Sequence, residues 1–126
     1  MRDPKPLPLN REILLGLLIA CVGASPVLAV RITEILYHPP TGRGVEFVEI
    51  FNEEPQALDL TGYHLCGGVS FTFDERTFLE PGGYLVIAAD ADALRALHGI
   101  DNVVGDFQGS LDNGGEEVAL CDNAGV

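Results

Sequence analysis

Residues 46–65 read EFVEIFNEEPQALDLTGYHL, and they carry the clearest folding signal in the chain. The run 46–51, in which acidic residues interrupt aromatic and aliphatic ones, predicts a strand. The strand should stop at Asn52 and Pro55, because asparagine tolerates turn geometry and proline lacks the N–H of a sheet ladder. The chain then turns at Gly62 and enters a second strand. This succession of strand, turn and strand predicts antiparallel β-structure.

Short strands separated by turn residues continue along the rest of the chain. Further strands are expected at residues 30–37, 57–60, 69–73, 84–89, 103–107 and 116–121. The run 84–89, YLVIAA, is the most apolar of these and should be a central strand. A hairpin turn is expected at 111–115, LDNGG, before the last strand. The pattern therefore predicts an all-β fold.

Residues 90–98, DADALRALH, predict one short connecting helix. Asp90 or Asp92 can accept its first backbone N–H groups, and Gly99 can end it. The same two aspartates follow an apolar strand, as does the Asp-x-Asp of haloacid-dehalogenase-type phosphatases. Because no lysine follows to hold a phosphate and no parallel-sheet repeat is present, helix capping is the favoured interpretation and no catalytic residue is assigned.

The chain is strongly acidic. Its 126 residues hold seven basic and 19 acidic side chains, for a formal net charge of −12. Such a surface repels phosphate backbones, so nucleic acid is not expected as a partner. Solubility outside the cell accounts for most of this acidity. The length suits a single domain with a modest core.

Residues 13–30 carry no charge and follow a short segment with three basic residues. The favoured interpretation is a secretory signal peptide over residues 1–29, cleaved between Ala29 and Val30. Lipidation of Cys21 and an uncleaved membrane anchor are the alternatives. We therefore expect an exported domain over 30–126, located outside the cell, at its surface or in the periplasm. Any membrane contact would come through the leader alone.

Two cysteines, Cys66 and Cys121, remain without the leader, and an even number suits an oxidising space. Each follows an expected strand at the same alternating position, so a disulfide is feasible if the two strands are neighbours. A bridge requires Cα atoms within about 7 Å, which sequence does not reveal. Two separate thiols are the favoured interpretation.

Metal sites have little support in the sequence. The chain has no Cys-x-x-Cys, and His38, His64 and His98 are too scattered for a triad. Calcium is the one ion that the acidic loops suggest, although no calcium-loop spacing is present. Asp and Asn are also preferred turn formers, so turn chemistry is the favoured explanation and no cofactor is expected. The aspartates concerned are Asp90, Asp92, Asp101, Asp106, Asp112 and Asp122.

An ordered series of short motifs resembles the lamin tail domain family. The series comprises I-x-E-I at 32–35, EFVEIFN at 46–52, LDLTGY-x-L at 58–65, F-x-F at 71–73, L-x-PGGYLV at 79–86 and L-x-N-x-GE-x-V-x-L at 111–120. The resemblance implies an immunoglobulin-like antiparallel β-sandwich that lacks its last strand, since the family's closing strand would follow residue 125. The structural residues that it implies are Glu34, Glu46, Glu49, Asn52, Leu60, Gly62, Tyr63, Pro81, Gly82, Gly83, Asn113 and Gly115. Tyr63 stands where the family often has tryptophan.

Three of these residues, Glu46, Glu49 and Asn52, invite interpretation as a binding site. The preferred interpretation is structural, with their side chains bonding backbone groups of the adjoining loop.

The resemblance implies a non-catalytic binding or spacer module for a protein or cell-surface partner. Residues 34–40 and 105–111 resemble the subset found in large exported bacterial proteins, where such modules accompany kinase-like domains, nucleases or other hydrolases. The alternative is therefore the N-terminal module of a larger exported enzyme whose catalytic part lies beyond residue 126. A filament-forming protein is disfavoured, because no heptad coiled coil is present.

Overall fold

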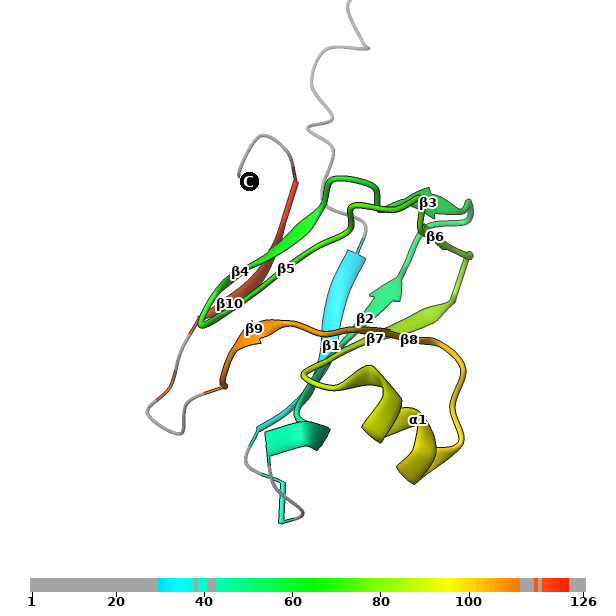
Figure 1. Cartoon of the computed structure of the whole chain (residues 1–126). Helices are drawn as coiled ribbons and strands as arrows, with labels where there is room; N and C mark the ends of the chain where they lie inside the picture. Colours follow the sequence, from blue (N-terminus) through cyan, green and yellow to red (C-terminus); the bar gives the residue numbers. More distant parts are fainter. Residues whose placement is uncertain (1–29, 38, 41–42, 112–114, 116, 123–126) are drawn as a thin grey trace, which may run out of the picture.

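The computed structural model describes residues 30–37, 39–40, 43–111, 115 and 117–122 (Figure 1). Several sequence predictions lie outside these residues: the leader with Cys21 and Ala29, His38, Asp112, Asn113 and the closing strand. In the described part of the chain, no helix has the length and apolar character needed to cross a membrane.

Two four-stranded sheets face each other (Figure 1). The first sheet has the order β1 (Val30–Leu36), β2 (Phe47–Asn52), β7 (Tyr84–Ala88), β8 (Val103–Gly105). The second has the order β10 (Val118–Cys121), β4 (His64–Gly67), β5 (Val69–Thr72), β9 (Gln108–Gly109). The pair β3 (Leu58–Asp59) and β6 (Phe78–Leu79) closes one end, and the short 3-10 turn η2 (Arg43–Val45) precedes β2. The predicted immunoglobulin-like β-sandwich is confirmed.

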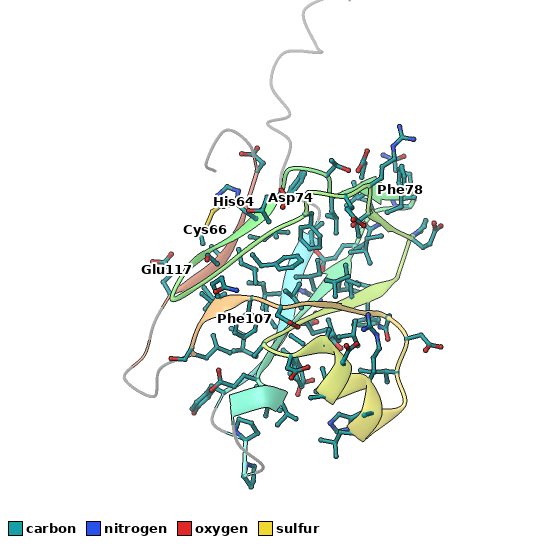
Figure 2. All side chains as sticks on the ribbon, in the orientation of Figure 1. His64, Cys66, Asp74, Phe78, Phe107 and Glu117 are labelled. Carbon is teal, nitrogen blue, oxygen red and sulfur yellow. A yellow bond between two sulfur atoms is a disulfide. The ribbon has the colours of Figure 1, made fainter. Side chains whose placement is uncertain are left out.

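The main core lies between the sheets, because strand residues alternate between inner and outer faces. Ile50 and Ile87 from the first sheet meet Leu65 and Val69 from the second, and all four are buried. Phe107 enters the same core from the segment that crosses between the sheets (Figure 2).

Strand β7 is central, as its apolar sequence predicts. Four of its five residues are buried, because both of its faces are covered. Leu85 and Ile87 face the second sheet, whereas Val86 and Ala88 pack beneath Leu94 of helix α1 (Ala91–His98) on the outer face.

Helix α1 begins and ends where the sequence predicts. The Asp90 carboxylate accepts a hydrogen bond from the Ala93 N–H at 2.9 Å. Gly99 adopts the left-handed conformation, with φ 64°, and donates its N–H to the Arg95 carbonyl. Asp92, the alternative cap, instead forms an exposed ion pair with Arg95. The cap is therefore Asp90.

Two features depart from the expected antiparallel succession. Strand β8 runs parallel to β7, because α1 carries the chain back along the sheet before β8 begins. The hairpin predicted at 111–115 is wrong, since β9 pairs with β5 and β10 with β4, at opposite edges of the second sheet. Gly115, between β9 and β10, has a positive φ of 84°.

Candidate interaction site

Asn52, at the end of β2, is fully buried and has a complete set of hydrogen bonds. Its side-chain amide donates to the carbonyl oxygens of Leu79 and Gln56, both at 2.9 Å, and of Glu80 at 3.2 Å. Its side-chain oxygen accepts the Glu54 N–H at 2.8 Å. This side chain therefore joins the turn after β2 to the turn before β7.

The backbone of Asn52 holds the same turn from the other side. Its N–H donates to the Gly83 carbonyl and its carbonyl accepts the Gly82 N–H, both at 3.0 Å. Gly82 has φ 65°, and a Cβ at Gly83 would lie 2.8 Å from the Glu80 carbonyl oxygen. The Pro81-Gly82-Gly83 turn is thus built against Asn52, which serves the fold.

Glu46 and Glu49 occupy different surroundings. The buried Glu46 carboxylate accepts the Leu111 N–H at 3.2 Å, beside the segment that leads toward β10. The Glu49 carboxylate lies on the outer face of the first sheet, where it accepts the Thr33 hydroxyl at 2.7 Å. Exposed Glu34 lies opposite Glu49 in the β1–β2 register. Glu46, Glu49 and Asn52 therefore do not converge on one site.

The LTGY motif, residues 60–63, contributes to the main core at one end of the sandwich. Leu60 is fully buried, and its N–H donates to the Thr77 carbonyl at 2.8 Å. Gly62 has φ 84° and donates to the Phe73 carbonyl, and half-buried Tyr63 packs against the main core. These residues position β4 and β5 and present no reactive group.

The predicted interpretation of Cys66 and Cys121 as separate thiols is wrong in this structure. The two residues form a disulfide, with Cα atoms 6.3 Å apart. Their strands, β4 and β10, are antiparallel neighbours, and strand pairing was the condition under which a bridge was feasible. A disulfide is typical of an oxidising compartment.

Three of the aspartates considered for catalysis or calcium have hydrogen-bond or ion-pair partners at helix α1. Asp90 caps α1, Asp106 accepts the Ala91 N–H at 2.9 Å, and Asp92 pairs with Arg95. Among the described residues, the one cluster with metal-ligand spacing contains no carboxylate; it consists of His64, Cys66 and Cys121.

The outer face of the first sheet contains a groove of about 320 Å³ beside helix α1. We call it the outer-face groove, and its lining consists of Phe47, Glu49, Val86, Leu94, His98 and Ile100. The sheet supplies its floor because Glu49 and Val86 are paired across β2 and β7. The helix supplies one wall through Leu94 and His98. The groove is mainly apolar, with one carboxylate and one imidazole at its boundary.

An aromatic pair extends this surface along the sheet. Phe51 and Tyr84 are paired across β2 and β7, two residues beyond Glu49 and Val86 and on the same face. Their ring centroids are 4.6 Å apart, and Tyr84 remains 49% exposed. Helix α1 covers the Ala88 end of this face, whereas the aromatic pair lies at the other end.

A second cavity, of about 360 Å³, lies between β5 and β8. Its lining includes Asp74 and Glu75 together with Phe71, Phe73 and the backbone of Gly105. Asp74 and Glu75 are exposed, and the lining of this cavity combines these carboxylates with aromatic side chains.

Most of the motif residues singled out in the sequence therefore stabilise the fold through packing and hydrogen bonds. The outer-face groove was not predicted from the sequence. Alternation of Phe47, Glu49 and Phe51 in one strand does signal an amphipathic outer face. The residues that complete the groove come from β7, α1 and the segment after α1, and their meeting is decided by the tertiary structure.

A family model of the Lamin Tail Domain matches residues 24–126, which is most of the chain. No curated protein matches the sequence at a significant level. The match spans both sheets, the Asn52 turn and the ordered motifs that resemble this family. The chain therefore belongs to the lamin tail domain family.

Proposed function

We propose that this lamin tail domain is a non-catalytic binding module of an exported protein, and that its outer-face groove binds a basic, apolar segment of a partner protein. The observation that carries the proposal is the half-exposed Phe51–Tyr84 pair beside the groove. Large aromatic side chains that remain exposed next to a concave apolar surface are typical of protein-binding sites.

Charge complementarity supports a basic partner. Glu49 lines the groove, Glu34 lies opposite it in the sheet, and the whole chain has a net charge of −12. A lysine or arginine of the partner can lay its apolar stem on the Tyr84 ring and direct its cationic end toward Glu49. An apolar neighbour in the partner would then enter the groove between Val86 and Leu94.

Two observations support the exported and non-catalytic parts of the proposal. The Cys66–Cys121 disulfide suits an oxidising compartment. The Asp90 and Asp92 carboxylates, which resemble a phosphatase pair in sequence, are engaged in helix capping and in an ion pair.

The test is selection of binders to the whole chain from a displayed random-peptide library. The selected peptides should be enriched in lysine or arginine next to an aromatic or aliphatic residue, and their binding should weaken as salt is added. Tyr84→Ala should then reduce the affinity of a selected peptide by about tenfold or more.

Phe78→Ala is the matched control, because Phe78 is a similarly exposed aromatic residue, at 53%, on the β3–β6 pair away from the groove (Figure 2). Equal losses for the two variants, or enrichment of acidic peptides, would contradict the proposal.

A further inference from the structure

His64, Cys66 and Cys121 lie together on the outer face of the second sheet, away from the outer-face groove. Their neighbours in sequence, Leu65 and Leu120, point into the core, so the three alternate residues point outward. His64 is directly opposite Cys121 in the β4–β10 register, and Cys66 is the next outward residue of β4. Figure 2 shows His64 and Cys66 next to each other on β4.

His64 lies close to the two bonded sulfurs, so the three side chains could supply ligands to one metal ion after reduction. The imidazole nitrogen and the two sulfur atoms all lie within 4.8 Å of one another, and all three residues are half-buried. A tetrahedral zinc ion, with Zn–S bonds of about 2.3 Å and Zn–N bonds of about 2.0 Å, needs ligand atoms roughly 3.5 to 3.8 Å apart. Once the disulfide is reduced, rotation of the two cysteine side chains can separate the sulfurs toward that spacing, since their Cα atoms are 6.3 Å apart.

We propose that reduction of the Cys66–Cys121 disulfide converts this group into a Zn²⁺ site with one imidazole and two thiolate ligands. A dithiol reductant supplies two electrons and two protons, becomes a disulfide itself, and leaves two protein thiols. Zn²⁺ then binds both sulfurs and His64 while the two thiol protons are released. The fourth position faces outward and takes water or an external ligand.

Backbone pairing, in addition to the disulfide, brings the ligand positions together. Four pairs in the β4–β10 register, from Val118–Gly67 to Cys121–His64, bring the ligand positions together. The Gly68 N–H extends this pairing to the Glu117 carbonyl at 3.2 Å. Gly67, with φ 107°, is required there, since a Cβ would lie 1.8 Å from the Glu117 carbonyl oxygen.

Because His64 and Cys66 are two residues apart on one strand, and Cys121 lies on the neighbouring strand, the site lacks the Cys-x-x-Cys spacing of loop-based zinc motifs. The disulfide and the zinc complex are mutually exclusive, because the thiolates that bind the metal exist only after reduction. The same surface thus has an oxidised, metal-free state and a reduced, zinc-binding state.

The experiment titrates the whole chain with Zn²⁺ after reduction with a phosphine under anaerobic conditions, beside the oxidised chain. The reduced protein should bind one zinc ion and the oxidised protein none. Cobalt(II) should produce thiolate-to-metal absorption bands only in the reduced protein. Bound zinc should also protect the Cys66 and Cys121 thiols from alkylation.

His64→Ala should lower the zinc affinity of the reduced protein by at least about tenfold. His98→Ala, on helix α1, is the matched control and should leave the affinity unchanged. Circular dichroism in each state separates metal binding from unfolding, and a reduced chain that refolds only with zinc would support the site. Equal zinc affinity in wild type and His64→Ala, absence of binding, or failure of zinc to restore an unfolded reduced chain would overturn it.

Discussion

The two sheets of this domain are held together in different ways. Strand β7 of the first sheet has four of its five residues buried, because α1 covers its outer face and the second sheet covers its inner face. In the second sheet, β4 and β10 each bury one residue of four. The first sheet therefore gains stability from packing on two faces, whereas the second has a disulfide across its β4–β10 pair.

Removing the disulfide tests this difference most directly. The double substitution Cys66→Ser with Cys121→Ser should lower the free energy of unfolding by about 4 kcal/mol, because the bridge closes a loop with a sequence separation of 55. Urea unfolding followed by circular dichroism, with a chelator present, measures the change. A loss below about 1 kcal/mol would show that packing alone holds the second sheet.

In the first sheet, the largest effect should come from Asn52. Asn52→Ala removes four side-chain hydrogen bonds, including the one to the buried Leu79 carbonyl, so we expect a loss of about 3 kcal/mol in unfolding free energy. Asn102→Ala is the matched control: this exposed residue donates one side-chain hydrogen bond, to the Tyr84 carbonyl, and should cost under about 0.5 kcal/mol. Similar losses in both variants would refute the special role of Asn52.

Helix α1, which covers the outer face of the first sheet, should contribute less to the free energy of unfolding than Asn52 does. Leu94→Ala in α1 should cost about 2 kcal/mol, toward the low end for a buried leucine, because a surface helix can shift to fill part of the space. Leu97→Ala in the same helix should change stability by under about 0.5 kcal/mol, since Leu97 is 54% exposed. Denaturant unfolding of both variants provides the comparison, and an equal cost would mean that α1 does not seal the first sheet.

The smallest expected effect on stability comes from an exposed turn next to β3, through the ionisation of Asp59. A hydrogen bond from the Thr61 hydroxyl, then one from the Thr61 backbone N–H, lowers the pKa of Asp59 below its ordinary value. Since the folded-state pKa lies below the unfolded one, the carboxylate contributes stability above the unfolded pKa, and this is lost as the pH falls through the folded pKa.

A carboxyl-carbon NMR titration measures this pKa directly. Thr61→Ala should raise the pKa of Asp59 toward its ordinary value, and Asp59→Asn should remove a small part of the acid sensitivity of stability. An ordinary pKa for Asp59 in the unsubstituted chain would contradict the prediction.

Local features of the fold follow from the sequence by itself. The apolar run that becomes β7, the cap at Asp90, the helix end at Gly99 and the turn at Pro81-Gly82 are each determined by neighbours in the chain. Backbone preferences, capping groups and turn residues act over a few residues, so they can be read from a single sequence. The ordered motifs likewise identify the family.

The candidate sites were decided by the tertiary structure. The parallel pairing of β8 with β7, the separation of β9 from β10 and the disulfide between Cys66 and Cys121 all depend on which strands become neighbours. The outer-face groove likewise combines β2, β7, α1 and the segment after it. Strand order is chosen by packing among segments far apart in sequence, whereas the signals for β7, the helix end at Gly99 and the Pro81-Gly82 turn act over a few residues.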